Sequence, residues 1–106
     1  MSAIQFALTG AAQGDIDAII DHYRLTAGAD VASRFLDSLD AAKRTLMLNP
    51  AIGARQEGLP RRQGEIRRWP LHSFPHRLFY QHDRRQILLL RVLHSARNWP
   101  ALLTED

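Results

Sequence analysis

Five side chains in the second half of the sequence could together cleave RNA. Cleavage through the 2′-oxygen needs a base for the hydroxyl, positive charge at the phosphate and an acid for the leaving oxygen. His94 could act as the base or the acid, because imidazole titrates near neutral pH. The arginines Arg67, Arg91 and Arg97 could hold the phosphate, and Tyr80 could stack on a base or donate a proton. These residues lie on predicted neighbouring strands or at their ends, so they could converge.

Structural interpretations compete with this chemistry. A histidine at a strand end is more often a hydrogen-bonded structural residue than a catalytic one. Tyr80 falls on the same predicted strand face as Leu78, which favours a core position with the hydroxyl at the rim. Arg91 lies in the most apolar segment, so it must find a carboxylate or stay solvated.

Metal and thiol chemistry are disfavoured. The chain has no cysteine, which excludes thiolate metal sites and cysteine nucleophiles. His72, His76 and His82 are close in sequence, but no carboxylate lies between them and Phe74-Pro75 would interrupt an aligning helix. We expect exposed loop histidines, no metal site and no cofactor.

The charge is unevenly distributed along the chain. Residues 1–50 carry four basic and six acidic side chains, whereas residues 51–106 carry ten arginines and five acidic side chains. Arginine suits phosphate and carboxylate recognition. The second half therefore indicates either a binding face for nucleic acid or an acidic protein segment, or a solvated arginine-rich surface.

The length of 106 residues predicts one domain over residues 1–106, with residues 94–106 as a C-terminal tail. The longest unbroken apolar run covers only residues 87–90, which is far too short for a membrane span. The N-terminus lacks the layout of a secretory signal. We therefore expect a small cytoplasmic protein that does not bind membranes.

Hydrophobic periodicity predicts a strand and then two helices in the first half. Alternation at Ile4, Phe6 and Leu8 indicates a half-buried strand over residues 3–8. Thr9 is the expected N-cap of the first helix and Asp30 that of the second. The apolar stripes are Ile16, Ile19, Ile20 and Tyr23 on the first helix, and Ala32, Phe35, Leu36, Leu39, Ala42 and Leu46 on the second.

The second half predicts a loop and three strands. Residues 50–64 are rich in glycine and proline and should be mostly loop. Strands are expected over residues 66–71, at an edge because of Pro70, over 77–81, and over 87–93, whose apolar character favours a central position. The order β-α-α-β-β-β predicts an α+β fold: an antiparallel or mixed sheet with a helical hairpin on one face and the other face open.

An ordered set of landmarks runs along almost the whole chain. They are Thr9, Ala12, Asp15, Ile16, Ile19 and Tyr23, then Ala32, Arg34, Phe35, Leu39, Ala42 and Leu46, then Pro50, Gly53, Arg67, Phe74, Pro75 and Tyr80, and finally Arg91, Val92, Leu93, His94 and Arg97. Together they resemble the ParE/RelE superfamily of bacterial toxin–antitoxin toxins, and most of all its ParE branch. Asn98 departs from the pattern, because the family often has an acidic residue there.

The resemblance implies a RelE/ParE-like fold and a type II toxin that a cognate antitoxin keeps inactive, with a higher-order hetero-oligomer as one form of the complex. ParE-type toxins are associated with inhibition of DNA gyrase, whereas RelE-type toxins are ribosome-dependent mRNA endonucleases. RelE-type nucleases use a denser lysine–arginine cluster and a tyrosine near the C-terminus. The segment after Arg97 offers neither lysine nor tyrosine.

We therefore expect a gyrase inhibitor that acts by protein–protein contact and has no catalytic residues. The alternatives are a RelE-like mRNA endonuclease, which would use the five residues named first, and a non-toxic nucleic-acid-binding module. The residues expected to contact a partner are Arg67, Arg91, Arg97, Trp99, Leu102 and Leu103. The last three could instead only cover the sheet edge.

Overall fold

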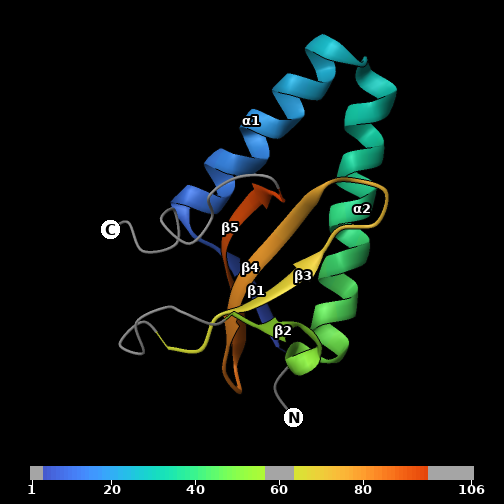
Figure 1. The fold of residues 1–106 in the computed structure, drawn as a ribbon. Helices are drawn as coiled ribbons and strands as arrows, with labels where there is room; N and C mark the ends of the chain where they lie inside the picture. The colour runs from blue at the N-terminus through green and yellow to red at the C-terminus, as the bar shows by residue number, and fades with distance from the viewer. Residues whose placement is uncertain (1–3, 57–63, 96–106) are drawn as a thin grey trace.

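The computed structural model describes residues 4–56 and 64–95, and these form a mixed sheet with two helices (Figure 1). The expected β-α-α-β-β-β order is confirmed, with one short extra strand in the stretch predicted to be loop. The elements are β1 (Gln5–Leu8), α1 (Gly10–Thr26), α2 (Ala29–Leu48), the 3₁₀ turn η1 (Pro50–Ile52), β2 (Ala54–Arg55), β3 (Arg67–Pro70), β4 (His76–His82) and β5 (Gln86–His94). Strand β2 was missed because two residues give no periodicity to read.

The sheet has the order β1-β5-β4-β3-β2. Strand β1 runs parallel to β5, and the other neighbours are antiparallel. The apolar last strand is interior, as expected from its sequence, although β4 takes the middle place. Strand β3 is flanked on its outer side only by the two residues of β2, and Pro70 is its final residue. Proline is tolerated there because it is close to the sheet edge.

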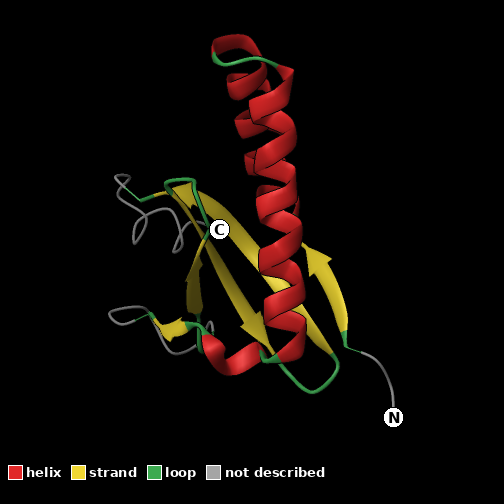
Figure 2. Cartoon of the chain, turned by 90° about the vertical axis from the view of Figure 1, so that its right-hand side faces the viewer, coloured by secondary structure: helices red, strands yellow, loops and turns green. Residues whose placement is uncertain are grey.

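Helices α1 and α2 form a hairpin that covers one face of the sheet (Figure 2). The Thr9 side chain caps α1, accepting a hydrogen bond from the Ala12 N–H at 3.0 Å, as predicted. The predicted cap of α2 is wrong: Gly28 is the N-cap, with a φ of 94°, and Asp30 lies in the first turn. The turn between the helices is so short that it needs a positive φ, which glycine adopts at little cost. No helix among the described residues has both the length and the apolar character for a membrane crossing.

The main core lies between the hairpin and the sheet. Its fully buried side chains include Phe35, Leu46, Leu78, Tyr80, Ile87 and Leu89. The side chains of Leu36 and Leu8 are about 40% exposed, so the prediction that both belong to buried faces is wrong. They lie at the margins of their apolar stripes, where periodicity does not separate core from rim.

A smaller cluster lies outside this core. Ile66, Phe79 and Leu93 are buried together, and Leu90 packs against them. Phe79 alternates with Leu78 and Tyr80 along β4, so it belongs to the face away from the helices. The expectation of an open second face is therefore wrong at this cluster.

Candidate functional site

The candidate residues fall into two groups on the sheet. Arg67 on β3 lies directly opposite Tyr80 on β4. Arg91 and His94 lie near the end of β5, and Arg97 lies outside the described residues. The structure thus brings Arg67 and Tyr80 together, and places Arg91 and His94 at another part of the sheet.

Tyr80 is completely buried and its hydroxyl is fully used. The hydroxyl donates to the Pro50 carbonyl at 2.7 Å and accepts from the Gly53 N–H at 3.0 Å. Burial raises the pKa of Tyr80, although the Gly53 hydrogen bond and the Arg67 charge act in the opposite direction. The core position is as predicted, but the hydroxyl is enclosed rather than at the rim. It cannot stack on a base, and it fastens the turn at residues 50–53 to the sheet.

Glycine at position 53 is required for this close approach. A Cβ atom there would lie 2.5 Å from the Tyr80 hydroxyl oxygen and 2.8 Å from the Arg68 carbonyl oxygen. Backbone and a buried ring cannot move away cheaply. Gly53 and Tyr80, both landmarks of the resemblance, are therefore one structural unit.

Arg67 holds the same turn from the neighbouring strand. Its Nη1 donates to the carbonyls of Ala51 at 3.0 Å and Gly53 at 2.8 Å, and its Nη2 lies 3.4 Å from a Glu65 carboxylate oxygen. The side chain is only 17% exposed. Arg67 and Tyr80 together form what we call the turn latch. Sequence reasoning missed it because its partners are backbone atoms of a loop.

Arg91 is paired with a carboxylate, as expected for an arginine in an apolar segment. Its Nε and Nη2 donate to the two oxygens of Asp15 on α1, at 2.7 and 2.9 Å. The same carboxylate accepts the Val92 N–H at 3.0 Å. Strand β1 ends opposite Leu89, so beyond that point α1 supplies the acceptor that a neighbouring strand would give. The ion pair therefore ties the helical hairpin to the edge of β5.

His94 is exposed at the end of β5 and lies opposite His76, with ring centroids 5.5 Å apart. The expectation of exposed loop histidines holds for His72 but is wrong for His82, the half-buried last residue of β4. It is also wrong for His76, which is 6% exposed and packs edge-on against Phe35 and Tyr23. Burial, reinforced by the charges of His94 and His22, lowers the pKa of His76 to about 4. His76 is thus a neutral ring in the core at pH 7. It lies in the sheet and not in a loop, because β4 begins one residue earlier than predicted.

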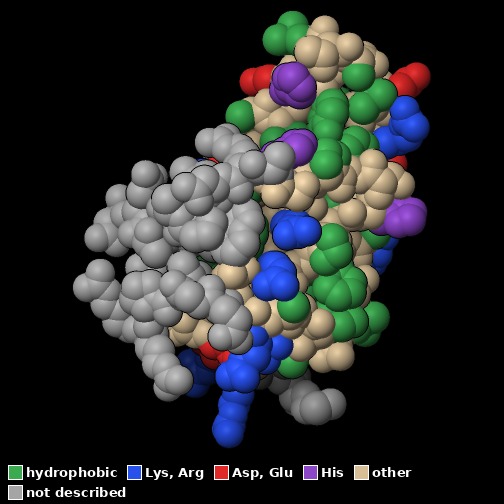
Figure 3. Space-filling view, in the orientation of Figure 1, with side chains coloured by type: hydrophobic (Ala, Val, Ile, Leu, Met, Phe, Trp, Pro, Cys, Tyr) green, Lys and Arg blue, Asp and Glu red, His purple; other side chains and the backbone are tan. Residues whose placement is uncertain are grey.

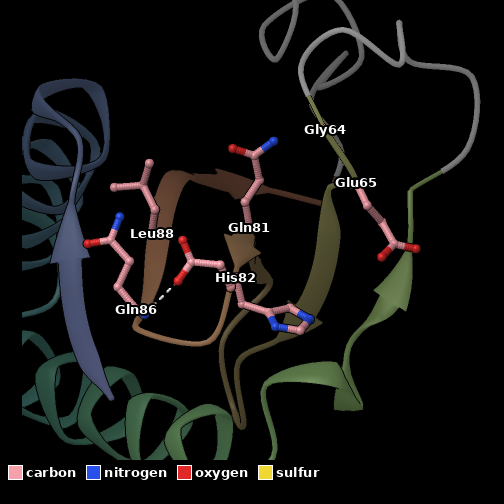
Figure 4. A pocket seen from close by; sticks show the side chains of 7 residues that line it. Gly64, Glu65, Gln81, His82, Gln86 and Leu88 are labelled. Atoms are coloured by element: carbon pink, nitrogen blue, oxygen red, sulfur yellow. Dashed lines mark hydrogen bonds between the residues drawn. The ribbon is translucent and has the colours of Figure 1, made fainter. Parts of the chain in front are cut away.

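Two surface hollows flank the sheet. One, of about 390 Å³, is reached by Gln81, Gln86 and Leu88 from β4 and β5 and by Glu65 from the segment before β3 (Figure 4). The other, of about 490 Å³, lies between α2 and the β3–β4 connection, where its lining includes Phe74. The lining of neither hollow includes His94 or Arg91. Within the described residues, no three His, Asp or Glu side chains are placed to hold a metal ion.

The residues predicted to contact a partner are either bonded within the chain or outside the described residues. Arg67 and Arg91 both bond within the chain. Arg97, Trp99, Leu102 and Leu103 lie outside the described residues. Arg68 lies opposite Phe79 and Arg77 lies two residues before it, so both share the face of Phe79; neither was singled out by the sequence.

Comparisons with known proteins place this architecture. The family described as the ParE toxin of the type II toxin–antitoxin system parDE matches residues 6–99. A solved structure of the chromosomal ParDE toxin–antitoxin system from P. aeruginosa shares the fold, with a TM-score of 0.68 and 24% identity over 87% of this chain and 96% of that chain. No curated protein sequence matches the chain. Because the family match covers most of its length, the chain belongs to the ParE toxin family of type II toxin–antitoxin systems.

Proposed function

We propose that this ParE-family toxin inhibits DNA gyrase by protein–protein contact, traps the enzyme on cleaved DNA and needs no catalytic residue of its own. Growth arrest would follow, because blocked gyrase halts replication. Family membership supports a toxin, and the ParE branch of the resemblance supports gyrase as its target.

One observation carries the contact mechanism. Of the four described residues that could cleave RNA, three are occupied in holding the fold together: Tyr80 and Arg67 in the turn latch, and Arg91 with Asp15. A general acid or phosphate-binding side chain must be able to reach the reacting atoms. A toxin that works through its surface makes no such demand.

We also propose that a cognate antitoxin neutralises the chain in the cytoplasm, where gyrase acts. The proposal follows from the type II family to which the chain belongs. A toxin and antitoxin in such a pair can assemble into a larger hetero-oligomer, with the toxin surface covered.

A gyrase assay tests the proposal. Purified, antitoxin-free toxin at micromolar concentration should inhibit supercoiling of plasmid DNA and leave cleaved DNA after denaturation of the enzyme. The same toxin premixed with the product of the adjacent reading frame should do neither. Full supercoiling and no cleaved DNA with a folded toxin would contradict the gyrase target.

One observation favours a second candidate function, the ribosome-dependent mRNA endonuclease: the imidazole of His94 is exposed. That activity requires mRNA cleavage on translating ribosomes by the wild type and its loss in His94→Ala. We expect intact mRNA with both proteins. Cleavage by the wild type alone would replace the gyrase proposal with this one.

A further inference from the structure

The outer edge of β1 is not paired with any described strand. Strand β1 lies at one end of the sheet, and its inner side pairs with β5. The N–H groups of Gln5 and Thr9 donate to backbone carbonyls on that inner side. Because successive residues of a strand alternate, the N–H and C=O groups of Phe6 and Leu8 face outward. An edge of this kind can accept a further strand.

This edge lacks the charges that usually protect an exposed strand. Residues 5–8 read Gln-Phe-Ala-Leu, with no charged residue and no proline, and Leu8 is 40% exposed. At the opposite edge, β2 has only two residues and one of them is Arg55. Lys and Arg side chains also lie over the middle of the sheet in Figure 3. Charged side chains and short strands prevent edge pairing, so β1 is the edge that remains open to it among the described strands.

The flank of α2 beside β1 is exposed as well. The Lys43 Nζ lies 5.4 Å from the centre of the Phe6 ring, which identifies the side of α2 that faces β1. Positions 36, 40, 43 and 47 follow each other at helical spacing and share that side. We call them the α2 stripe: Leu36, Asp40, Lys43 and Met47. The first three are exposed and the last is half-buried.

The α2 stripe is complementary to a reversed copy of itself. When two stripes run antiparallel about the point midway between Asp40 and Lys43, each Asp40 meets Lys43 of the other copy. Each Leu36 then meets Met47 of the other copy. Neither Asp40 nor Lys43 forms an ion pair with a described residue of its own chain. A second copy therefore brings opposite charges together and covers apolar surface with apolar surface.

The strand and the helix put the two-fold axis at the same level. With the axis at Ala7, Phe6 lies opposite Leu8 of the second copy, and the two residues exchange both N–H···O=C bonds. Ala7 is about 3.3 Å along β1 from Phe6, which lies beside Lys43. The midpoint of the α2 stripe is about 2.2 Å along α2 from Lys43. Both steps go the same way, because α2 runs in the opposite direction to β1 (Figures 1 and 2).

We infer that two copies of this chain join edge to edge through β1, with their α2 helices antiparallel across the contact. The sheet then continues from one copy into the next about a two-fold axis at Ala7. The contact consists of one short strand and one helix flank, which is at the small end of specific interfaces. We therefore expect a dissociation constant of about 10 µM. The inference does not depend on gyrase as the target.

Sedimentation equilibrium of the purified, antitoxin-free toxin tests the dimer. The mass should rise from 12.1 kDa towards twice that value between about 1 and 100 µM. Asp40→Lys and Lys43→Glu each place like charges opposite one another at both symmetry-related positions, so each should weaken association at least about tenfold. The double variant restores opposite charges and should recover most of the association. The matched control is Asp37→Lys, which makes the same charge change on the flank of α2 that lines the larger hollow and should leave association unchanged.

Ala7→Cys tests the register of the two strands, because the chain has no other cysteine. At the two-fold axis the two copies of residue 7 form a non-hydrogen-bonded pair with Cα atoms about 4.5 Å apart, which a disulfide can bridge. Mild oxidation should therefore give a covalent dimer. The control is Gln5→Cys, which should give little covalent dimer because the two copies of residue 5 lie at least about 13 Å apart in this register.

A wild type that stays monomeric at every concentration would overturn the inference, as would a wild type that associates only with the product of the adjacent reading frame. Equal association of Asp40→Lys and Asp37→Lys, or no recovery in the double variant, would overturn the pairing of the α2 stripes. Faster disulfide formation by Gln5→Cys than by Ala7→Cys would overturn the register. Thermal unfolding of each variant shows that the fold is kept.

Discussion

Replacing Tyr80 with phenylalanine removes one oxygen atom from the centre of the turn latch and keeps the ring. The variant leaves the Pro50 carbonyl without its donor and the Gly53 N–H without its acceptor. Because the site is closed to water, the loss should exceed that of an ordinary exposed hydrogen bond. We expect the free energy of unfolding to fall by about 2 kcal/mol, the cost of leaving buried polar groups unsatisfied.

Tyr23→Phe is the matched control. It also removes one tyrosine hydroxyl, but the Tyr23 hydroxyl makes no hydrogen bond with a described residue, so its loss should cost less than about 0.5 kcal/mol. Thermal unfolding of the three proteins makes the comparison, and for a chain of this size about 2 kcal/mol corresponds to a fall in Tm of roughly 10 °C. Equal stability of the two variants would refute the latch. Loss of toxicity in a Tyr80→Phe protein that remains folded would refute its purely structural role.

Three further variants test other parts of the structure. Asp15→Asn should lower the free energy of unfolding in urea by about 2 kcal/mol, because it leaves Arg91 without its counter-charge. Asp17→Asn, at an exposed site, should change the free energy of unfolding little. Equal effects of the two variants would show that the ion pair is unimportant. Gly53→Ala should destabilise the chain by more than about 1 kcal/mol, because the added Cβ overpacks the site. Gly14→Ala, whose Cβ would lie in open space on α1, should be neutral or stabilising. The reverse order of Tm values would contradict the close approach at Gly53. Because the pKa of His76 is depressed, its imidazole binds a proton more readily in the unfolded chain than in the folded one, so the free energy of unfolding should fall as the pH drops from 6.5 towards about 4. His76→Phe should flatten that part of the pH profile. An unchanged slope would contradict the burial of the ring.

The sequence was enough to find both helices, four of the five strands and the packing of the hairpin on one face of the sheet. The prediction depends on stripes such as Ile16 on α1 and Phe35 on α2, which local sequence displays directly. The alternating pattern also placed Tyr80 in the core. Periodicity could not show β2, which is too short, or the start of β4 at His76, since Phe74-Pro75 resembles loop sequence.

The candidate site was harder to predict, because its residues are defined by distant partners. The sequence indicates that Arg91 needs a carboxylate, but six aspartates lie on the helices and only the fold selects Asp15. Arg67 shows the same difficulty, since its acceptors are the backbone carbonyls of Ala51 and Gly53. Composition reports the number of arginines, and the fold decides which of them are occupied.

Gyrase inhibition measured against both toxin concentration and time tests the central claim most directly, because a contact inhibitor is consumed stoichiometrically and an enzyme turns over. With gyrase fixed, the loss of supercoiling should follow the molar ratio of toxin to gyrase, reach a plateau and stay constant on longer incubation, while mRNA on translating ribosomes remains intact. Supercoiling unaffected at any ratio, together with mRNA cleavage that grows with time at substoichiometric toxin, would contradict it.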